Sequence, residues 1–210
     1  MSGLFITFEG GEGCGKSTQI KLLAQVLQER GYNVLQLREP GGTAVGERVR
    51  DVLLAKENVA MDPVAELMLY EAARAQIVVE LIRPALAEGK IVLCDRFYDS
   101  TIAYQGFGRG LDIQLIKNLN EAATGGLRPD LTLLLMIDPA EGLARAKGVT
   151  GGDGEGDRIE AAGLEFHTRV QEGFAYMAQL EPERIAVVGA QGSVADVHDA
   201  VMARVLALLG

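Results

Sequence analysis

A glycine-rich segment at residues 10–17 directly follows an apolar run at residues 4–8, and this arrangement constrains the fold more than any other feature. The segment reads Gly10-Gly11-Glu12-Gly13-Cys14-Gly15-Lys16-Ser17. Glycines tolerate the backbone conformations that turn successive N–H groups inward around phosphate oxygens. Lys16 adds a compact positive charge, Ser17 offers a hydroxyl for Mg²⁺, and a following helix would point its positive dipole end at the same phosphates. The segment is therefore predicted to bind the phosphates of a nucleoside triphosphate.

The sequence behind this loop favours a phosphate-binding loop over a glycine-rich turn that holds a lysine by chance. Apolar residues recur with helical spacing at positions 20, 22, 23, 26 and 27. A strand, a glycine-rich loop and an amphipathic helix in that order are what the motif requires. The expected donor-binding residues are Gly10, Gly11, Glu12, Gly13, Cys14, Gly15, Lys16, Ser17 and Thr18.

The composition is that of a globular chain with a single core. With 210 residues, of which 48% are hydrophobic and 23% charged, the chain is long enough for one domain over residues 1–210. The formal net charge of −9 argues against a general nucleic-acid-binding protein, because such proteins present broad basic surfaces. An anionic substrate would therefore have to meet a local cluster of arginines.

Cysteine usage and hydropathy indicate a reducing, cytoplasmic environment. The two cysteines, Cys14 and Cys94, are too few for a disulfide framework or a zinc site, and we interpret both as small space-filling residues. No apolar run approaches the roughly 18 residues of a membrane span, and no secretory leader is recognisable. No membrane partner is expected.

Short apolar runs alternate with longer helical patterns along the chain, which predicts an α/β fold. Strands are expected at residues 4–8, 33–37, 91–94, 131–137 and 184–188. Helices are expected at residues 16–30, 44–55, 63–88, 111–123, 140–147, 161–179 and 194–209. Strands that are apolar on both faces and separated by helices predict a doubly wound parallel sheet of five strands, flanked by helices. Ligands of such sheets bind beyond the carboxyl ends of the strands.

The residues that follow the third expected strand carry chemistry suited to a phosphate. Asp95 and Arg96 would lie beside the glycine-rich loop if the first and third strands are neighbours. An acid there can position Mg²⁺ or the acceptor, and an arginine can hold a phosphate with two parallel hydrogen bonds. The alternative is a structural ion pair at a strand end, but the nearby phosphate loop favours a functional role.

Two further segments offer groups that could bind a base. Tyr70 and Arg74 lie four residues apart on an expected helix, so that a ring and a planar cation share one face. A partly buried tyrosine beside an arginine that reaches solvent is the alternative. Residues 98–110 are rich in hydroxyls and glycines, which predicts a binding loop rather than a core element, although a solvated loop would have the same composition.

Together these segments resemble one family closely, the thymidylate kinases among the nucleoside monophosphate kinases. The segments that carry the resemblance are residues 8–17, Arg38-Glu39-Pro40-Gly41-Gly42-Thr43, Asp95-Arg96-Phe97, residues 100–110 and Asp157-Arg158-Ile159-Glu160. They occur in the family's order over most of the chain. The phosphate loop is shared by many ATPases and GTPases, whereas the Arg-Glu-Pro-Gly-Gly and Ala-Tyr-Gln-Gly segments are far more restrictive.

The resemblance implies roles for residues around the acceptor's sugar and phosphate. Glu12 would reach the 3′-hydroxyl of the acceptor sugar, while Arg50 and Arg96 would hold its phosphate. Asp95 is expected to position the metal or the acceptor, and with Ser17 it forms the expected metal site. Arg38 belongs to the same expected substrate set.

The resemblance also implies how the base is recognised. Tyr70 would stack on thymine at a place where the family often has phenylalanine, and Arg74 and Gln105 would contact the base edge. Thr101 occupies a small-hydroxyl position near the base. Tyr104 lies where the family excludes a ribose 2′-hydroxyl. Ser100 completes the expected substrate-binding residues.

The phosphate loop contains no arginine, and the resemblance is to family members that supply the catalytic cation from a lid. An arginine near the transferring group is worth roughly 10³–10⁵ in rate. The lid would span residues 145–158, helical at its start and glycine-rich after Lys147. Arg145, Lys147 and Arg158 are the candidate cations, with Arg145 ranked first and Arg158 second. The alternative for Arg158 is a salt bridge to Glu160 or Asp157. The glycine-rich centre replaces the usual arginine-rich one, which leaves open which cation contacts phosphate.

These expectations describe an ATP-dependent kinase for dTMP that uses Mg²⁺ and produces dTDP and ADP for dTTP supply. The expected catalytic residues are Glu12, Lys16, Asp95, Arg96, Arg145 and Arg158. The alternatives are a kinase for another nucleoside monophosphate and a P-loop switch protein, although the Asn-Lys-x-Asp element of such switches is missing from the sequence. The resemblance also implies a homodimer.

Overall fold

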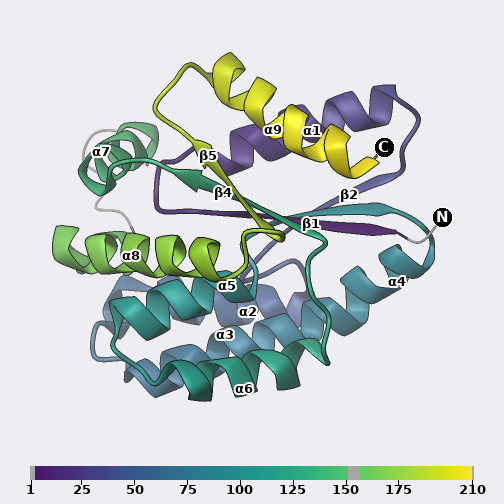
Figure 1. The fold of residues 1–210 in the computed structure, drawn as a ribbon. Helices are drawn as coiled ribbons and strands as arrows, with labels where there is room; N and C mark the ends of the chain where they lie inside the picture. The colour runs from purple at the N-terminus through teal and green to yellow at the C-terminus, as the bar shows by residue number, and fades with distance from the viewer. Residues whose placement is uncertain (1–2, 151–156, 210) are drawn as a thin grey trace.

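The computed structural model describes residues 3–150 and 157–209, and one parallel β-sheet is its centre (Figure 1). The strand order is β2-β3-β1-β4-β5, and every neighbouring pair is parallel. The strands are β1 (Leu4–Glu9), β2 (Val34–Arg38), β3 (Ile91–Asp95), β4 (Leu131–Met136) and β5 (Ile185–Gly189). This confirms the predicted doubly wound sheet, with each strand boundary within two residues of its expected position.

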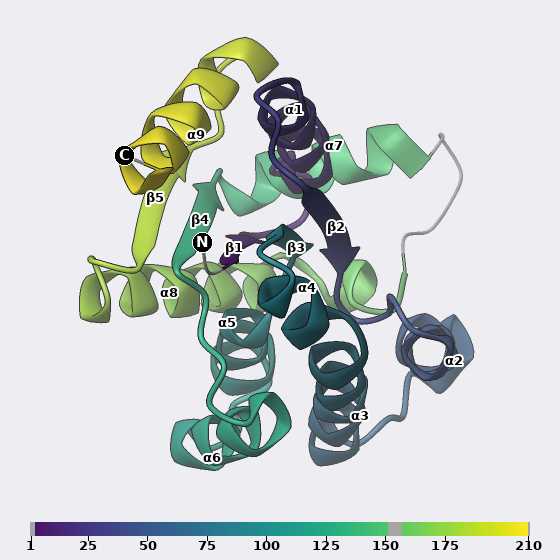
Figure 2. The ribbon, with the colours of Figure 1, turned by 90° about the vertical axis from the view of Figure 1, so that its right-hand side faces the viewer.

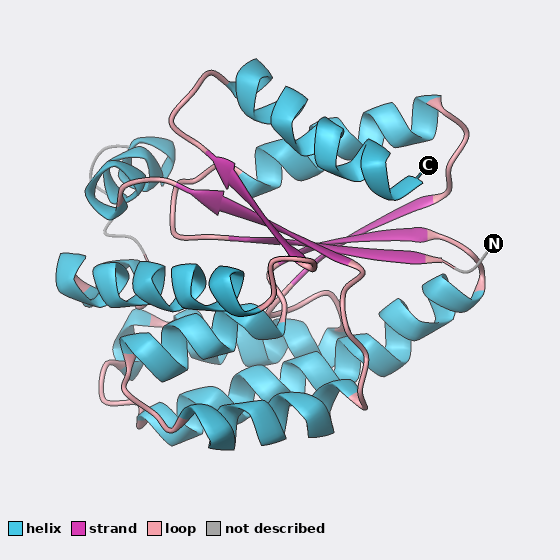
Figure 3. Cartoon of the chain, in the orientation of Figure 1, coloured by secondary structure: helices cyan, strands magenta, loops and turns pink. Residues whose placement is uncertain are grey.

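Helices cover both faces of the sheet (Figures 2 and 3). Those α-helices are α1 (Lys16–Glu29), α2 (Ala44–Leu54), α3 (Pro63–Ile77), α4 (Arg83–Ala87), α5 (Tyr98–Thr101), α6 (Ile113–Thr124), α7 (Pro139–Thr150), α8 (Leu164–Leu180) and α9 (Val194–Leu209). The π-helical segments are η2 (Val78–Ile82) and η3 (Ile102–Gly108), and the short 3₁₀ segments are η1 (Lys56–Asn58) and η4 (Glu160–Ala162). In Figure 2, α1 and α9 lie above the sheet, and α3, α5, α6 and α8 lie below it.

Each face of the sheet has its own apolar core, because alternate strand residues point to opposite sides. Ile6 and Phe8 of β1 pack with the buried faces of α1 and α9. Phe5, the residue before Ile6, packs on the other side with residues of η2 and β3. A third cluster joins η3 to α8. Within the described residues, no helix is both long and apolar enough to cross a bilayer.

Side-chain caps set the start of several helices. The Thr43 hydroxyl accepts a hydrogen bond from Gly46 N at the start of α2. Asp62 caps α3 and is followed by Pro63, a residue that fits the first helical turn. The predicted helix over residues 63–88 is helical from Pro63 to Ala87, but η2 interrupts its α-helical hydrogen bonding.

The prediction of a binding loop at residues 98–110 is wrong for most of that segment, which folds as α5 and η3. The segment packs against α8, where Gly173 makes room for it: a Cβ there would lie 2.9 Å from the Phe107 ring. Its polar side chains are buried and satisfied internally, as in the 2.9 Å bond from Thr101 Oγ1 to Asn120 Oδ1. The polar composition therefore reflects buried hydrogen bonding rather than contact with solvent.

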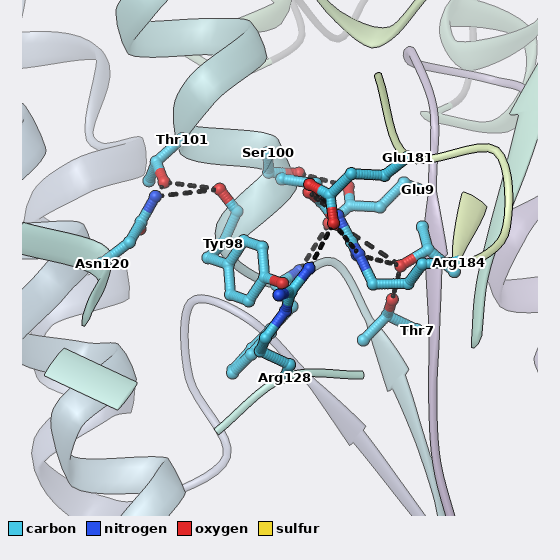
Figure 4. A network of polar contacts seen from close by, with 12 residues as sticks. Thr7, Glu9, Tyr98, Ser100, Thr101, Asn120, Arg128, Glu181 and Arg184 are labelled. Carbon is cyan, nitrogen blue, oxygen red and sulfur yellow. Dashed lines mark hydrogen bonds and ion pairs between the residues drawn. The ribbon is translucent and has the colours of Figure 1, made fainter. Parts of the chain in front are cut away.

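A buried ion pair joins this segment to the start of β5 (Figure 4). Arg184 Nη1 and Nη2 donate to the two oxygens of the Asp99 carboxylate at 2.7 and 2.8 Å. Thr132 of β4 lies beside them, and its hydroxyl is 2.8 Å from that of Thr7 in β1. This network ties α5 to the underside of the sheet.

Replacing one partner of this buried pair should be costly, because it leaves an unpaired charge in the interior. Asp99→Asn is expected to lower the free energy of unfolding by roughly 3–5 kcal/mol. Glu165→Gln, which breaks an ion pair in which the glutamate is 92% exposed, should cost less than about 1 kcal/mol. Urea unfolding of both variants measures the difference, and similar losses would contradict a dominant role for the Asp99–Arg184 pair.

Candidate functional site

A cavity of about 460 Å³ opens at the carboxyl ends of the central strands. It extends from the phosphate loop to α7 and to the residues that follow the expected lid. The predicted site residues that line it are Glu12, Gly13, Cys14, Gly15, Lys16, Ser17, Thr18, Arg38, Arg50, Tyr70, Asp95, Arg96, Ser100, Thr101, Tyr104, Gln105 and Arg145. Gly10, Gly11, Arg74 and Arg158 are not among the described residues that line it.

The phosphate loop has a conformation that only glycine accommodates at several positions. Gly13 has φ 63°, and a Cβ on it would lie 2.0 Å from the carbonyl oxygen of Gly142 in α7. A Cβ on Gly10 would lie 2.2 Å from the carbonyl oxygen of Leu135 in β4. Lys16 Nζ folds back over the loop and donates to Gly11 O at 2.8 Å. The loop is thus held between β4 and α7, with the ammonium group of Lys16 over the turn.

Ser17 and Asp95, the two residues of the predicted metal site, lie in contact between the loop and β3. The Ser17 hydroxyl donates to Asp95 Oδ2 at 2.7 Å. No group of three or more His, Cys, Asp and Glu side chains that could hold a metal occurs in the described part of the chain. Mg²⁺ suits a site with one or two protein oxygens, because it retains several waters and takes further ligands from substrate phosphates. This pair therefore fits a magnesium ion that arrives with a nucleotide.

Arg96 lies at the centre of the cavity wall and has an unusual backbone conformation. Its φ is 70°, the only positive value among the described non-glycine residues. The guanidinium donates from Nη1 to Gly10 O at 3.0 Å and from Nη2 to Glu12 Oε1 at 2.7 Å. It also lies over the Tyr104 ring, 4.9 Å from the ring centroid. The arginine therefore joins the phosphate loop to β3 and η3.

Glu12 is held as a carboxylate by the groups around it. Burial alone would raise its pKa, but Arg96, Lys16 and the hydrogen bond from Tyr104 outweigh that effect and lower the pKa to about 2. The Tyr104 hydroxyl donates to Glu12 Oε1 at 2.7 Å, on the same oxygen that Arg96 contacts. A negative charge is therefore fixed between the phosphate loop and the tyrosine.

Two arginines from the β2–α2 region approach the same part of the cavity. Arg38 Nη1 and Arg50 Nη1 both donate to the carbonyl oxygen of Pro40, at 3.2 and 3.0 Å. Burial and the nearby Arg38 lower the pKa of Arg50. Arg38 also pairs with Glu47 at 2.8 Å. With Arg96, these side chains form a local cationic cluster in an acidic protein.

The expected base-binding residues separate into cavity-lining and buried groups. Tyr70, Thr101 and Gln105 line the cavity. Arg74 is only 1% exposed, and its guanidinium contacts the carboxylates of Glu39 and Glu71 at 2.9 and 2.7 Å.

Arg74 reaches the cavity only indirectly in this structure. Its Nη1 lies 3.4 Å from the hydroxyl of Thr101, which lines the cavity. Its contact with a base edge stays a prediction, and its visible role is to support the cavity wall.

The two expected lid arginines differ in position. Arg145 of α7 lines the cavity, with Nη1 donating to Ala190 O at 3.0 Å and Nη2 paired with Glu141 at 2.6 Å. Arg158 is buried; its Nη2 lies 2.6 Å from Glu66 Oε2 and its Nε donates to Leu53 O. An internal carboxylate therefore holds Arg158 in this structure, and its contact with phosphate stays a prediction.

The lid itself is only partly described. The helix that begins it does not end at Lys147 but continues to Thr150. The following residues of the expected glycine-rich centre, 151–156, lie outside the described residues.

Sequence reasoning missed several residues that line the cavity or support it. The cavity also includes Glu39, Pro40, Leu54, Ala146, Asp157, Ile159 and Glu160. Glu66 supports it from α3 by accepting hydrogen bonds from Gln105 and Arg109. Several of these residues lie inside the quoted motifs, which was the available signal. Nothing in the sequence alone pairs Glu66 with η3 or with Arg158.

Comparisons with known proteins agree on one family. The model of the family described as thymidylate kinase matches residues 8–201. The chain belongs to the thymidylate kinase family. It is 54% identical over 194 residues to the thymidylate kinase of Synechococcus sp. (strain JA-2-3B'a(2-13)), covering 92% of this chain and 90% of that protein. Identity to the thymidylate kinase of Geobacter sulfurreducens is 52% over 209 residues, covering 97% and 98%.

A solved structure supports the same conclusion. The crystal structure of thymidylate kinase from Ehrlichia chaffeensis superposes with a TM-score of 0.79 at 37% identity and covers 98% of this chain and 100% of that one. The family and fold predicted from sequence are thus confirmed. As a member of the thymidylate kinase family, the chain is an enzyme of nucleotide biosynthesis: a nucleotide-binding phosphotransferase of the kinase class.

The depressed pKa of Glu12 makes a prediction about stability and pH. Because its pKa falls from 4.5 to about 2 on folding, the ionised group stabilises the native state above about pH 4.5. Glu12→Gln should therefore lower the free energy of unfolding by about 3 kcal/mol at neutral pH. The difference in the free energy of unfolding between the variant and the unsubstituted protein should narrow as the pH falls from 4.5 toward 2. Urea unfolding across this range measures it, and a gap that widens in acid would refute the assignment.

Proposed function

We propose that this kinase transfers the γ-phosphoryl group of ATP to the 5′-monophosphate of thymidine, giving ADP and dTDP, for dTTP supply. The observation that carries the proposal is one cavity lined by the phosphate loop, by arginines and by side chains that can contact a base. The donor phosphates would lie on the loop amides beside Lys16, at the amino end of α1. ATP and dTMP are the proposed partners, Mg²⁺ is the proposed cofactor, and no nucleic acid or membrane partner is proposed.

The acceptor would occupy the other end of the cavity. Its phosphate would bind Arg96 and Arg50, with Arg38 nearby, because these guanidinium groups converge there. Its sugar would lie against Glu12 and Tyr104, where a carboxylate can accept a hydrogen bond from a 3′-hydroxyl. As the family resemblance implies, the Tyr104 ring would exclude a ribose 2′-hydroxyl, which would favour a deoxynucleotide.

The base would lie between Tyr70 and η3. The Tyr70 ring offers a stacking surface, and Gln105 carries both a donor and an acceptor for a base edge. The Gln105 amide is already oriented, since Nε2 donates to Glu66 Oε1 at 2.8 Å. Thr101, Ser100 and the buried Arg74 complete this wall.

Phosphoryl transfer between these sites needs positioning and charge neutralisation rather than a covalent enzyme intermediate. An oxygen of the acceptor phosphate attacks the γ-phosphorus, a new P–O bond forms, and the bond to the bridging oxygen of ADP breaks. Ser17 and Asp95 are the residues that would hold Mg²⁺, which when bound neutralises charge on the donor phosphates. Arg96 holds the attacking group in place, and Lys16 holds the donor.

Arg145 is the proposed lid cation for the transferring group. It lies on α7 against the phosphate loop and lines the cavity, whereas Arg158 is bound by Glu66. A lid that closes only over bound ATP would exclude water and so protect the γ-phosphoryl group from hydrolysis. We further propose a cytoplasmic homodimer, on the family resemblance.

The substrate assignment is tested by measuring ADP release across nucleoside monophosphates in a coupled assay. The account predicts that dTMP is used in clear preference to UMP, CMP and GMP, at fixed ATP. A preference for one of the other monophosphates would refute the acceptor and leave the donor site intact. ATP binding without transfer to any monophosphate would instead favour a nucleotide-dependent switch.

The cationic cluster makes a specific kinetic prediction. Arg50→Ala should lower kcat/KM for dTMP roughly 10- to 100-fold, the effect of losing a hydrogen bond to a charged group, while the KM for ATP stays nearly constant. Arg48→Ala is the matched control, because Arg48 is exposed on the same helix and does not line the cavity. Equal effects of the two changes, or equal effects on both substrates, would contradict the role of Arg50.

A further inference from the structure

Glu9, the last residue of β1, has a buried carboxyl group that none of the steps above uses. It is 0% exposed and is not among the described residues that line the cavity. Its Oε1 accepts a hydrogen bond from Phe97 N at 2.8 Å, and the Ser100 hydroxyl donates to its Oε2 at 2.6 Å (Figure 4). Both partners lie within four residues of Arg96, so the carboxyl group bridges β1 to the turn that carries this arginine.

The turn at Arg96 is held from β1 on both sides. Arg96 N donates to Phe8 O at 2.9 Å, and the next amide, Phe97 N, donates to Glu9. Between these bonds Arg96 has φ 70°, a left-handed conformation that costs a non-glycine residue on the order of 1–2 kcal/mol. Such a conformation persists only where the surrounding contacts impose it.

Ser100 extends this restraint to the side chain of Arg96. Arg96 Nη1 lies 3.3 Å from the Ser100 Oγ, which Glu9 in turn holds. One carboxyl group therefore contacts a backbone amide that fixes the turn and a hydroxyl that touches the guanidinium.

We propose that Glu9 is a positioning residue for the kinase reaction, which holds the Arg96 turn in its left-handed conformation so that the guanidinium faces the acceptor phosphate. This proposal rests on the proposed function of Arg96. Glu9 does not contact substrate in this account and acts only through Arg96 and Ser100.

The electrostatic state of Glu9 suits this task. Burial and the nearby Asp99 raise its pKa to about 8, against the opposing effects of Arg96, Ser100 and Phe97 N. The raised pKa favours the neutral form of the carboxyl group, whose carbonyl oxygen still accepts the hydrogen bond from Phe97 N. A neutral carboxyl group can fix the turn without competing with Glu12 or with a substrate phosphate for the charge of Arg96.

A double-mutant cycle separates positioning from general structural support. Glu9→Met fills the volume but offers the turn no acceptor oxygen, and it should lower kcat/KM for dTMP roughly 10- to 100-fold, the scale of a misplaced binding group. In the Arg96→Ala background the same change should have less than about a 2-fold further effect. The KM for ATP should change little in either case.

Three further variants complete the experiment. Glu9→Gln keeps the shape, one acceptor and the neutral charge, and it should recover most of the loss. Glu9→Asp, too short to span both bonds, repeats the cycle if Glu9→Met does not fold. Asp130→Ala is the control: Asp130 accepts a hydrogen bond from Phe5 N at 2.7 Å near the opposite end of β1, and its loss should leave the kinetics for dTMP unchanged.

The outcomes are distinguishable. Equal losses from the Glu9 change in the presence and absence of the Arg96 side chain overturn the positioning role and leave the proposed reaction untouched. Unchanged dTMP turnover in Arg96→Ala refutes both the assigned role of Arg96 and this proposal. The proposal is supported if Glu9→Met lowers kcat/KM for dTMP only when the Arg96 side chain is present, and if Glu9→Gln restores most of that loss.

Discussion

The ion pair between Arg96 and Glu12 is the interaction on which the site depends. It joins the residue after β3 to the phosphate loop after β1, at 2.7 Å. The two strands can be joined in this way because they are parallel neighbours, with Phe8 opposite Asp95. Their carboxyl ends therefore open at the same edge of the sheet, as in other doubly wound folds. Donor and acceptor chemistry meet there without any residue having to cross the sheet.

Buried carboxylates decide which arginines are available to a substrate. Asp99 holds Arg184, Glu66 holds Arg158, and Glu39 with Glu71 holds Arg74. These pairs stiffen the walls of the cavity, since breaking one would strand a charge in the interior. The excess of acidic residues is thus compatible with an anionic substrate: part of it orders internal arginines, and a separate set of arginines lines the cavity.

Sequence patterns predicted the sheet, its flanking helices and most of the cavity-lining residues, because these depend on local periodicity and on motifs that need a fixed spacing. The patterns failed where a polar side chain is satisfied by a distant partner. The polar composition of residues 98–110 predicts a loop, but the hydrogen bonds of Ser100, Thr101 and Gln105 to Glu9, Asn120 and Glu66 bury these side chains in helical turns.

The same limit explains Arg158. Its position at the end of the expected lid indicates a cation for phosphate, whereas its partner Glu66 lies on α3, far away in the sequence. Glu9 was overlooked because a single acid before a glycine-rich loop gives no sign of what it contacts. Which acid pairs with a given arginine in the interior depends on the packing of the whole chain, and a motif does not contain that information.

The most direct test of the account is a crystal structure of the kinase with dTMP and a non-hydrolysable ATP analogue. The account predicts the triphosphate on the loop amides beside Lys16, and the acceptor phosphate within hydrogen-bond distance of Arg96 and Arg50. It also predicts the thymine ring stacked on Tyr70, with the Gln105 amide at its edge. An acceptor phosphate that contacts neither arginine, or a thymine outside the pocket formed by Tyr70 and Gln105, would contradict it.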